Sequence, residues 1–138
     1  MCMIKSIQNA FLILLLFTLF AGCESNNSFM TKSGIESKLQ GKWDMVRIPH
    51  TRPGSIWEFN SGVINIYELD SANKVAQKNV GTYEVVAKIA TPYIVIQEVS
   101  GFYAGGRWVI INLDDKYLTI NRQDDGTFGT IQREFVKQ

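Results

Sequence analysis

Three arginines, Arg47, Arg107 and Arg122, lie in segments whose residue types are typical of β-strands. A guanidinium group recognises a carboxylate or a phosphate through paired hydrogen bonds. Because side chains alternate between the faces of a strand, Arg47 shares a face with Trp43 and Met45, and the other two share faces with apolar residues of their own strands. The pattern predicts cations that point inward and bind the anionic head group of an amphiphile. Two alternatives stay open: bulges would turn some arginines outward, or acids would pair them, the candidates being Glu58, Glu84 and Glu98.

The residues that usually carry out catalysis are scarce in this chain. His50 is the only histidine, and it lies in a loop predicted over residues 49–55. Ser55 is close to it, but no serine has the surrounding sequence of a nucleophile elbow. The two Asp–Asp pairs occupy predicted turns, where Asp side chains accept backbone hydrogen bonds: Asp114 with Asp115, and Asp124 with Asp125. We therefore expect no enzymatic activity.

Composition narrows the class of protein further. The chain has 138 residues, which allows one domain, and its net charge of +1 argues against a nucleic-acid partner. A hydrophobic share of 46% is too high for a disordered chain. One His and two Cys nearly exclude a zinc site built from these ligands. We expect neither a metal nor a cofactor.

The N-terminal residues have the pattern of an export signal. Lys5 precedes an apolar run over residues 10–20, which is shorter than the roughly 20 residues that span a bilayer. The run ends in Phe20-Ala21-Gly22-Cys23, which resembles a bacterial lipobox apart from Phe20. This resemblance implies cleavage before Cys23 and lipidation of its thiol, so that no pair of thiols remains for an internal disulfide.

These features divide the chain into three parts. Residues 1–22 form the signal peptide, residues 23–37 the lipidated Cys and a polar tether, and residues 38–138 the folded domain. The predicted location is the bacterial cell envelope, with the membrane as a partner through the lipid anchor. We expect the outer membrane, with the domain facing the periplasm or the exterior.

The domain itself is predicted to be all-β. Residues 33–40 favour one helical turn, with Ser33 as its cap, and eight strands follow. Tight turns such as Asn60-Ser61-Gly62 alternate with longer links, among them a link over 70–79, so one end of a meander carries the longer loops. Eight strands can close into an up-and-down antiparallel barrel. The predicted strands are 42–48, 56–60, 63–69, 80–87, 93–99, 107–113, 117–122 and 128–136.

Several short motifs resemble lipocalin-like domains of small Bacteroidetes lipoproteins. They include Gly41-Lys42-Trp43 at the first strand, and they continue in order with residues 57–60, 80–85, 117–120 and 133–135. The resemblance implies a barrel whose closed end holds Trp43 against an arginine of the last strand, here Arg133. In that strand Ile131, Arg133 and Phe135 share a face.

The predicted function is non-covalent binding of a small apolar or amphiphilic molecule. The glycine-flanked Phe102 and Tyr103 would form either a lid or a protein-contact patch at the loop end, or fold back as a plug. The alternative function is a filled barrel that docks to an envelope protein. Five aromatic residues would fill so small a barrel if most of them point inward, which would favour this alternative: Trp57, Phe59, Tyr67, Tyr83 and Trp108.

Overall fold

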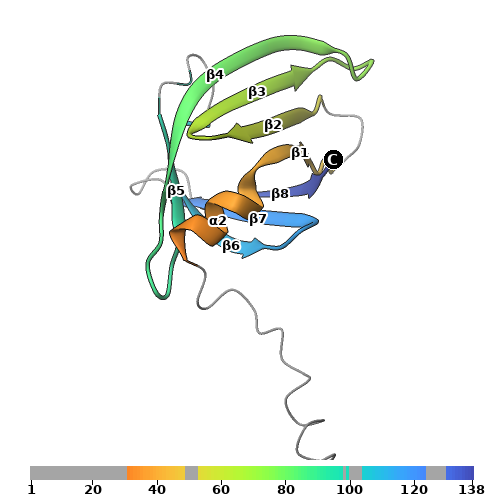
Figure 1. Cartoon of the computed structure of the whole chain (residues 1–138). Coiled ribbons are helices and arrows are strands. Elements are labelled where there is room, and N and C mark those ends of the chain that lie inside the picture. The colour runs from red at the N-terminus through yellow and green to blue at the C-terminus, as the bar shows by residue number, and fades with distance from the viewer. Residues whose placement is uncertain (1–30, 49–52, 98, 100–103, 124–129) are drawn as a thin grey trace, which may run out of the picture.

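The computed structural model describes residues 31–48, 53–97, 99, 104–123 and 130–138 as one short helix and eight strands (Figure 1). Each strand pairs antiparallel with the next, and β1 pairs with β8, which closes the barrel. The predicted closed, eight-stranded antiparallel barrel is confirmed. The elements are α2 (Lys32–Leu39), β1 (Gly41–Met45), β2 (Ser55–Asn60), β3 (Val63–Leu69), β4 (Val75–Val86), β5 (Tyr93–Gln97), β6 (Gly106–Leu113), β7 (Tyr117–Gln123) and β8 (Thr130–Lys137).

Some predicted residues lie outside the described part of the chain. They are the whole signal segment with Cys23, His50 in the first link, Phe102 and Tyr103 in the fifth, and Asp124 with Asp125 in the seventh. No helix within the described ranges is long and apolar enough to cross a membrane.

Strands form because apolar and polar residues alternate along most of them. In β2, Trp57 and Phe59 are buried while Glu58 between them is on the outer face. The same period of two runs through β4, where Tyr83 and Val85 are buried and Glu84 is exposed. The buried set of each strand faces the barrel interior, which forms a single core.

The link predicted over residues 70–79 is wrong, because β4 begins at Val75 and most of that segment is strand. Only a short turn joins β3 to β4. The Oδ1 atom of Asp70 accepts hydrogen bonds from the backbone N–H groups of Ala72 (2.8 Å) and Lys74 (2.9 Å). Asn73 takes the left-handed conformation, with φ of 59°. Side-chain capping of this kind explains how so polar a segment forms a tight turn between two long strands.

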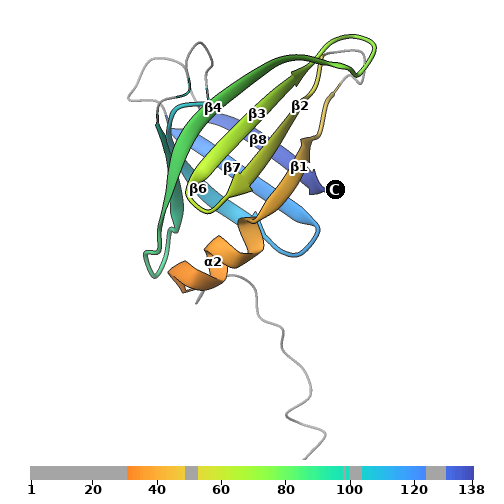
Figure 2. The ribbon, with the colours of Figure 1, turned by 45° about the horizontal axis from the view of Figure 1, so that its top comes forward.

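Helix α2 covers one end of the barrel (Figure 2). The cap lies two residues before the predicted Ser33: Thr31 caps the helix by accepting a hydrogen bond from the Gly34 N–H at 3.1 Å. Ile35 and Leu39 are four residues apart, lie on one helix face and are fully buried. Their burial makes α2 a packed part of the core.

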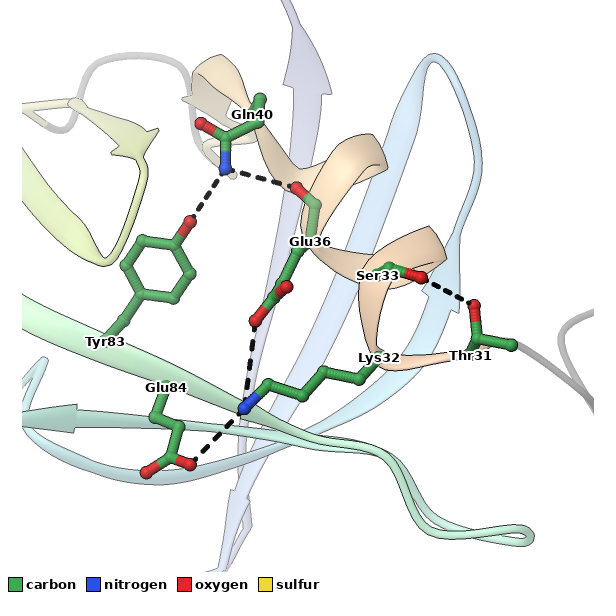
Figure 3. Close-up of polar contacts among 7 residues, drawn as sticks. All are labelled: Thr31, Lys32, Ser33, Glu36, Gln40, Tyr83 and Glu84. Atoms are coloured by element: carbon green, nitrogen blue, oxygen red, sulfur yellow. Dashed lines mark hydrogen bonds and ion pairs between the residues drawn. The ribbon is translucent and has the colours of Figure 1, made fainter.

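Polar contacts fix α2 against the neighbouring strands (Figure 3). Gln40 donates from Nε2 to the Tyr83 hydroxyl at 2.9 Å, and its Oε1 accepts from the Ser61 N–H at 3.1 Å. Lys32 lies 3.5 Å from Glu84, but both side chains are more than half exposed, so water screens this ion pair. The buried residues and Gln40 therefore hold the helix more firmly than the ion pair does.

Trp43 links α2 to the barrel. It is fully buried, and its Nε1 donates a hydrogen bond of 2.7 Å to the Leu39 carbonyl. The cation against its ring is Lys137, whose Nζ lies 5.0 Å from the ring centroid. The predicted contact with Arg133 is wrong, since the pairing of β1 with β8 puts Lys137 opposite Trp43 and Arg133 four residues further toward the other end.

We predict that Trp43→Ala lowers the free energy of unfolding by about 3–5 kcal/mol, the range for deletion of a large buried aromatic. Trp43→Phe should lose less, because it keeps most of the apolar contact and removes only the N–H bond to Leu39. Chemical denaturation of the two variants measures both effects. A midpoint that Trp43→Ala leaves unchanged would contradict this placement.

Asp114 closes the β6–β7 turn. Its Oδ1 accepts hydrogen bonds of 2.7 Å from the backbone N–H groups of Lys116 and Tyr117. The bond from Lys116, followed by that from Tyr117, lowers the pKa of the Asp114 carboxyl below its usual value. The ionised form therefore stabilises the fold.

Because the pKa of Asp114 is lower in the folded than in the unfolded chain, its contribution is complete above the unfolded value of about 3.9. It disappears as the pH falls through the folded value. We predict that Asp114→Asn is less stable than the wild type at neutral pH, and that the difference begins to shrink near pH 4 and disappears as the pH falls through the lower folded value. Urea denaturation of both proteins across that range measures the difference; a difference that stays constant with pH would refute the role of the ionised carboxyl.

Candidate binding site at the loop-bearing end

The end of the barrel opposite α2 carries the links β1–β2, β3–β4, β5–β6 and β7–β8, because neighbouring strands are antiparallel (Figure 2). It includes the two longest links, residues 46–54 and 98–105. We call it the loop-bearing end. Loops on a rigid scaffold are where binding residues concentrate, so the inward side chains near this end are the candidates for a site.

Five aromatic side chains, the aromatic layer, fill the middle of the barrel: Trp57, Phe59, Tyr83, Trp108 and Phe135. Trp57 is central, with ring centroids 5.1 Å from Phe135, 5.7 Å from Trp108 and 6.4 Å from Phe59. Phe59 meets Tyr83 edge-on at 5.0 Å. Tilted and edge-to-face pairs of this kind are favoured by the charge distribution of the rings. The layer extends from Tyr83, which is hydrogen-bonded to Gln40 next to α2, to Trp108, which contacts Arg122 toward the loop-bearing end.

Of the five aromatic residues predicted as candidates for the interior, Tyr67 lies on the outer face instead. Its hydroxyl donates to Glu58 at 2.7 Å, and this bond to a carboxylate is the main reason that the pKa of Tyr67 is raised. Glu58 is also within 4.0 Å of Lys42, and Glu84 pairs with Lys32. Two of the acids considered as arginine partners therefore bind other groups on the outside, and Glu98 lies outside the described residues.

Arg133 lies inside the barrel, against the aromatic layer. Its guanidinium carbon is 5.2 Å from the Trp57 ring centroid and 5.3 Å from that of Trp108. Its Nη1 donates to the Met45 sulfur at 3.8 Å. Burial lowers the pKa of the guanidinium, and the charge of neighbouring Arg122 lowers it further. Arg133 thus lies on the predicted inward face of β8. It lies toward the loop-bearing end of the barrel, however, and not beside Trp43 at the α2 end.

Arg122 approaches the same tryptophan. Its guanidinium carbon is 5.6 Å from the Trp108 ring centroid, and Nη1 donates to the Gly105 carbonyl at 3.2 Å. The Trp108 N–H in turn donates to the carbonyl of Ala104, a fully buried residue, at 2.7 Å. The described end of the β5–β6 link therefore packs onto the barrel and holds both Trp108 and Arg122. Arg122 and Arg133 therefore both contact the indole ring of Trp108.

The Trp57 N–H adds a third donor. The side chain is fully buried, and its Nε1 has no hydrogen-bond partner within the described part of the chain. A buried donor without an acceptor is energetically unfavourable, by about 1–3 kcal/mol. Together with Arg122 and Arg133, this N–H makes the interior around the aromatic layer rich in donors, the chemistry that suits an anion.

Arg47 does not join this pair. It lies beyond the end of β1, half-buried, and its Nη1 donates to Asn73 in the β3–β4 turn at 3.1 Å. The guanidinium packs so closely on Gly54 that a Cβ there would be 2.9 Å from the Arg47 side chain. A side chain at residue 54 would therefore require the end of the Arg47 side chain to shift.

Arg107 was expected to point inward, and this expectation is wrong. It is exposed on the outer face of β6, with its guanidinium 4.6 Å from the Tyr93 ring centroid. The reason is a bulge between Ile110 and Asn112, which inserts one residue into the alternation. Counting back from buried Leu113 therefore assigns Arg107 to the wrong face.

Comparison of the chain with models of protein families, with curated proteins and with solved structures finds no match. Within the described ranges, no group of three or more His, Cys, Asp and Glu residues could hold a metal ion. What Arg122, Arg133 and Trp57 can do is hold an anion by charge-assisted hydrogen bonds.

Proposed function

We propose that this protein is a lipid-anchored component of the cell envelope, and that its lipocalin-like barrel binds a small anionic molecule non-covalently at the loop-bearing end. Arg122 and Arg133 are its proposed anion-binding residues. The observation that carries the proposal is the pair of guanidinium groups on the inward side of β7 and β8, both against Trp108.

The charges of Arg122 and Arg133 repel each other. Burial and the neighbouring charge both disfavour ionised Arg133. An anion between the guanidinium groups would offset this repulsion through charge-assisted hydrogen bonds. The aromatic layer would contact the apolar part of the same molecule, and because the layer occupies the middle of the barrel, we expect that part to be short.

The second candidate function is a filled barrel that docks to an envelope protein. It is favoured by the aromatic layer itself, since four of the five aromatic residues that were expected to decide the question lie inside. The two candidates differ in one measurable respect: only the first requires that a small anion bind between Arg122 and Arg133.

Hexyl phosphate tests the first candidate, with hexanol as its neutral match. We predict that hexyl phosphate binds the full-length protein in lipid nanodiscs and that Arg122→Gln and Arg133→Gln each weaken binding at least tenfold. Tryptophan fluorescence reports binding, because both arginines lie against Trp108. Hexanol should bind more weakly and should not distinguish the variants.

Arg107→Gln is the matched control, because it removes the same charge from the outer face and should leave the affinity unchanged. Circular dichroism and thermal melting of each variant establish that the barrel is folded. Equal affinity of wild type, Arg122→Gln and Arg133→Gln for hexyl phosphate would overturn the proposed site. The same holds if no binding to the folded wild type is detected, a result that favours the docking function.

The proposed anchor has a separate test in the source bacterium. Labelled palmitate should enter the wild-type protein, and Cys23→Ser should lose the label and leave the membrane fraction or remain uncleaved. Cys2→Ser should behave like the wild type, because residue 2 belongs to the segment that is removed. Undiminished labelling of Cys23→Ser would exclude this residue as the lipidation site.

A further inference from the structure

An acidic side chain lies on the inward face of the barrel at the loop-bearing end, on the wall opposite the arginines. It is Glu68, near the end of β3, and the strand order places β3 four strands away from β7. Register confirms its face: Glu68 is paired with Ser55 of β2, a buried residue that shares the inward face with Trp57. A bulge follows between Glu68 and Leu69, a feature that often re-aims a side chain.

Two amides orient this carboxylate. Asn79 of β4, only 4% exposed, donates from Nδ2 to Glu68 Oε1 at 3.1 Å. Gln77 donates from Nε2 to the Asn79 Oδ1 atom at 2.8 Å, which fixes the amide with its NH₂ group toward Glu68. Asn79 is the buried member of this partly buried relay, which holds the carboxylate in place.

The carboxylate and the arginines are connected by neutral side chains. Arg133 contacts the Met45 sulfur at 3.8 Å, the Ser55 hydroxyl donates to the same sulfur at 3.7 Å, and Ser55 is the cross-strand neighbour of Glu68. We call the row Arg122, Arg133, Met45, Ser55, Glu68 and Asn79 the polar arc. It follows β7, β8, β1, β2, β3 and β4 in their order around the barrel. The arc is cationic at one end and anionic at the other.

From this arrangement we propose that the ligand is amphoteric: its anionic group binds Arg122 and Arg133, and a protonated amine binds Glu68. The proposal rests on the proposed function and adds the second charge. An ammonium group would gain an ion pair with an already oriented carboxylate. A ligand with negative charge at both ends would be repelled by Glu68, so the arc selects against it.

Alkyl phosphates and ω-aminoalkyl phosphates of equal length, with two to six methylene groups, test the proposal. In each pair a methyl group replaces the ammonium group, so the pair isolates the second charge. The full-length protein in nanodiscs should bind the best amino compound at least fivefold more tightly than its methyl counterpart. Titration calorimetry measures both affinities.

Glu68→Gln should abolish this preference while it leaves the affinity for the alkyl phosphate equal or higher, because Gln still accepts the bond from Asn79. Glu84→Gln, which removes the same charge from the outer face, should keep the preference. If alkyl phosphates bind through the arginines but no amino compound is preferred, or if Glu68→Gln keeps the preference, the amphoteric ligand is refuted and the anion site stands. If neither series binds the folded protein, the proposed function itself fails.

Discussion

The central constraint in this barrel is that the guanidinium group of Arg133 is held inside it, against two tryptophans. A cation in such a position is stabilised by the faces of the indole rings, a contact that contributes about 0.5–2 kcal/mol. Desolvation and the charge of Arg122 act against it, as the lowered pKa of Arg133 shows. Trp57 and Trp108 also determine how the core packs, so the cation and the aromatic layer depend on each other.

The two ends of the barrel differ in the side chains that line them. At one end α2 buries Ile35 and Leu39 and is joined to Trp43, so the interior there is occupied by the chain itself. At the other end the inward side chains include two arginines and a carboxylate beside apolar residues such as Met45 and Ile131. The described chain begins at Thr31, next to α2. If Cys23 carries a lipid, the tether therefore joins the barrel at the end opposite the polar arc.

Much of the fold could be predicted from the sequence, because strand alternation and turn residues are local signals. The prediction that Trp57 and Phe59 can fill the interior is right, and so is the inward face predicted for Arg133 in β8. The errors come from features that alternation does not encode. The bulge in β6 puts Arg107 on the outer face of the barrel. The register between β1 and β8 places Lys137, and not Arg133, against the Trp43 ring. Glu68 shares the face of Ile64 and Ile66 in β3, but its partner Asn79 lies in a segment predicted as a loop, because nothing local shows that a polar segment continues β4 there.

The measurement that tests this account most directly is native mass spectrometry of the protein as it is released gently from the source envelope, with identification of any bound small molecule. The account predicts one molecule per chain that carries both an acidic and an amino group. An empty barrel that is isolated instead with a protein partner would contradict the account and establish the docking function.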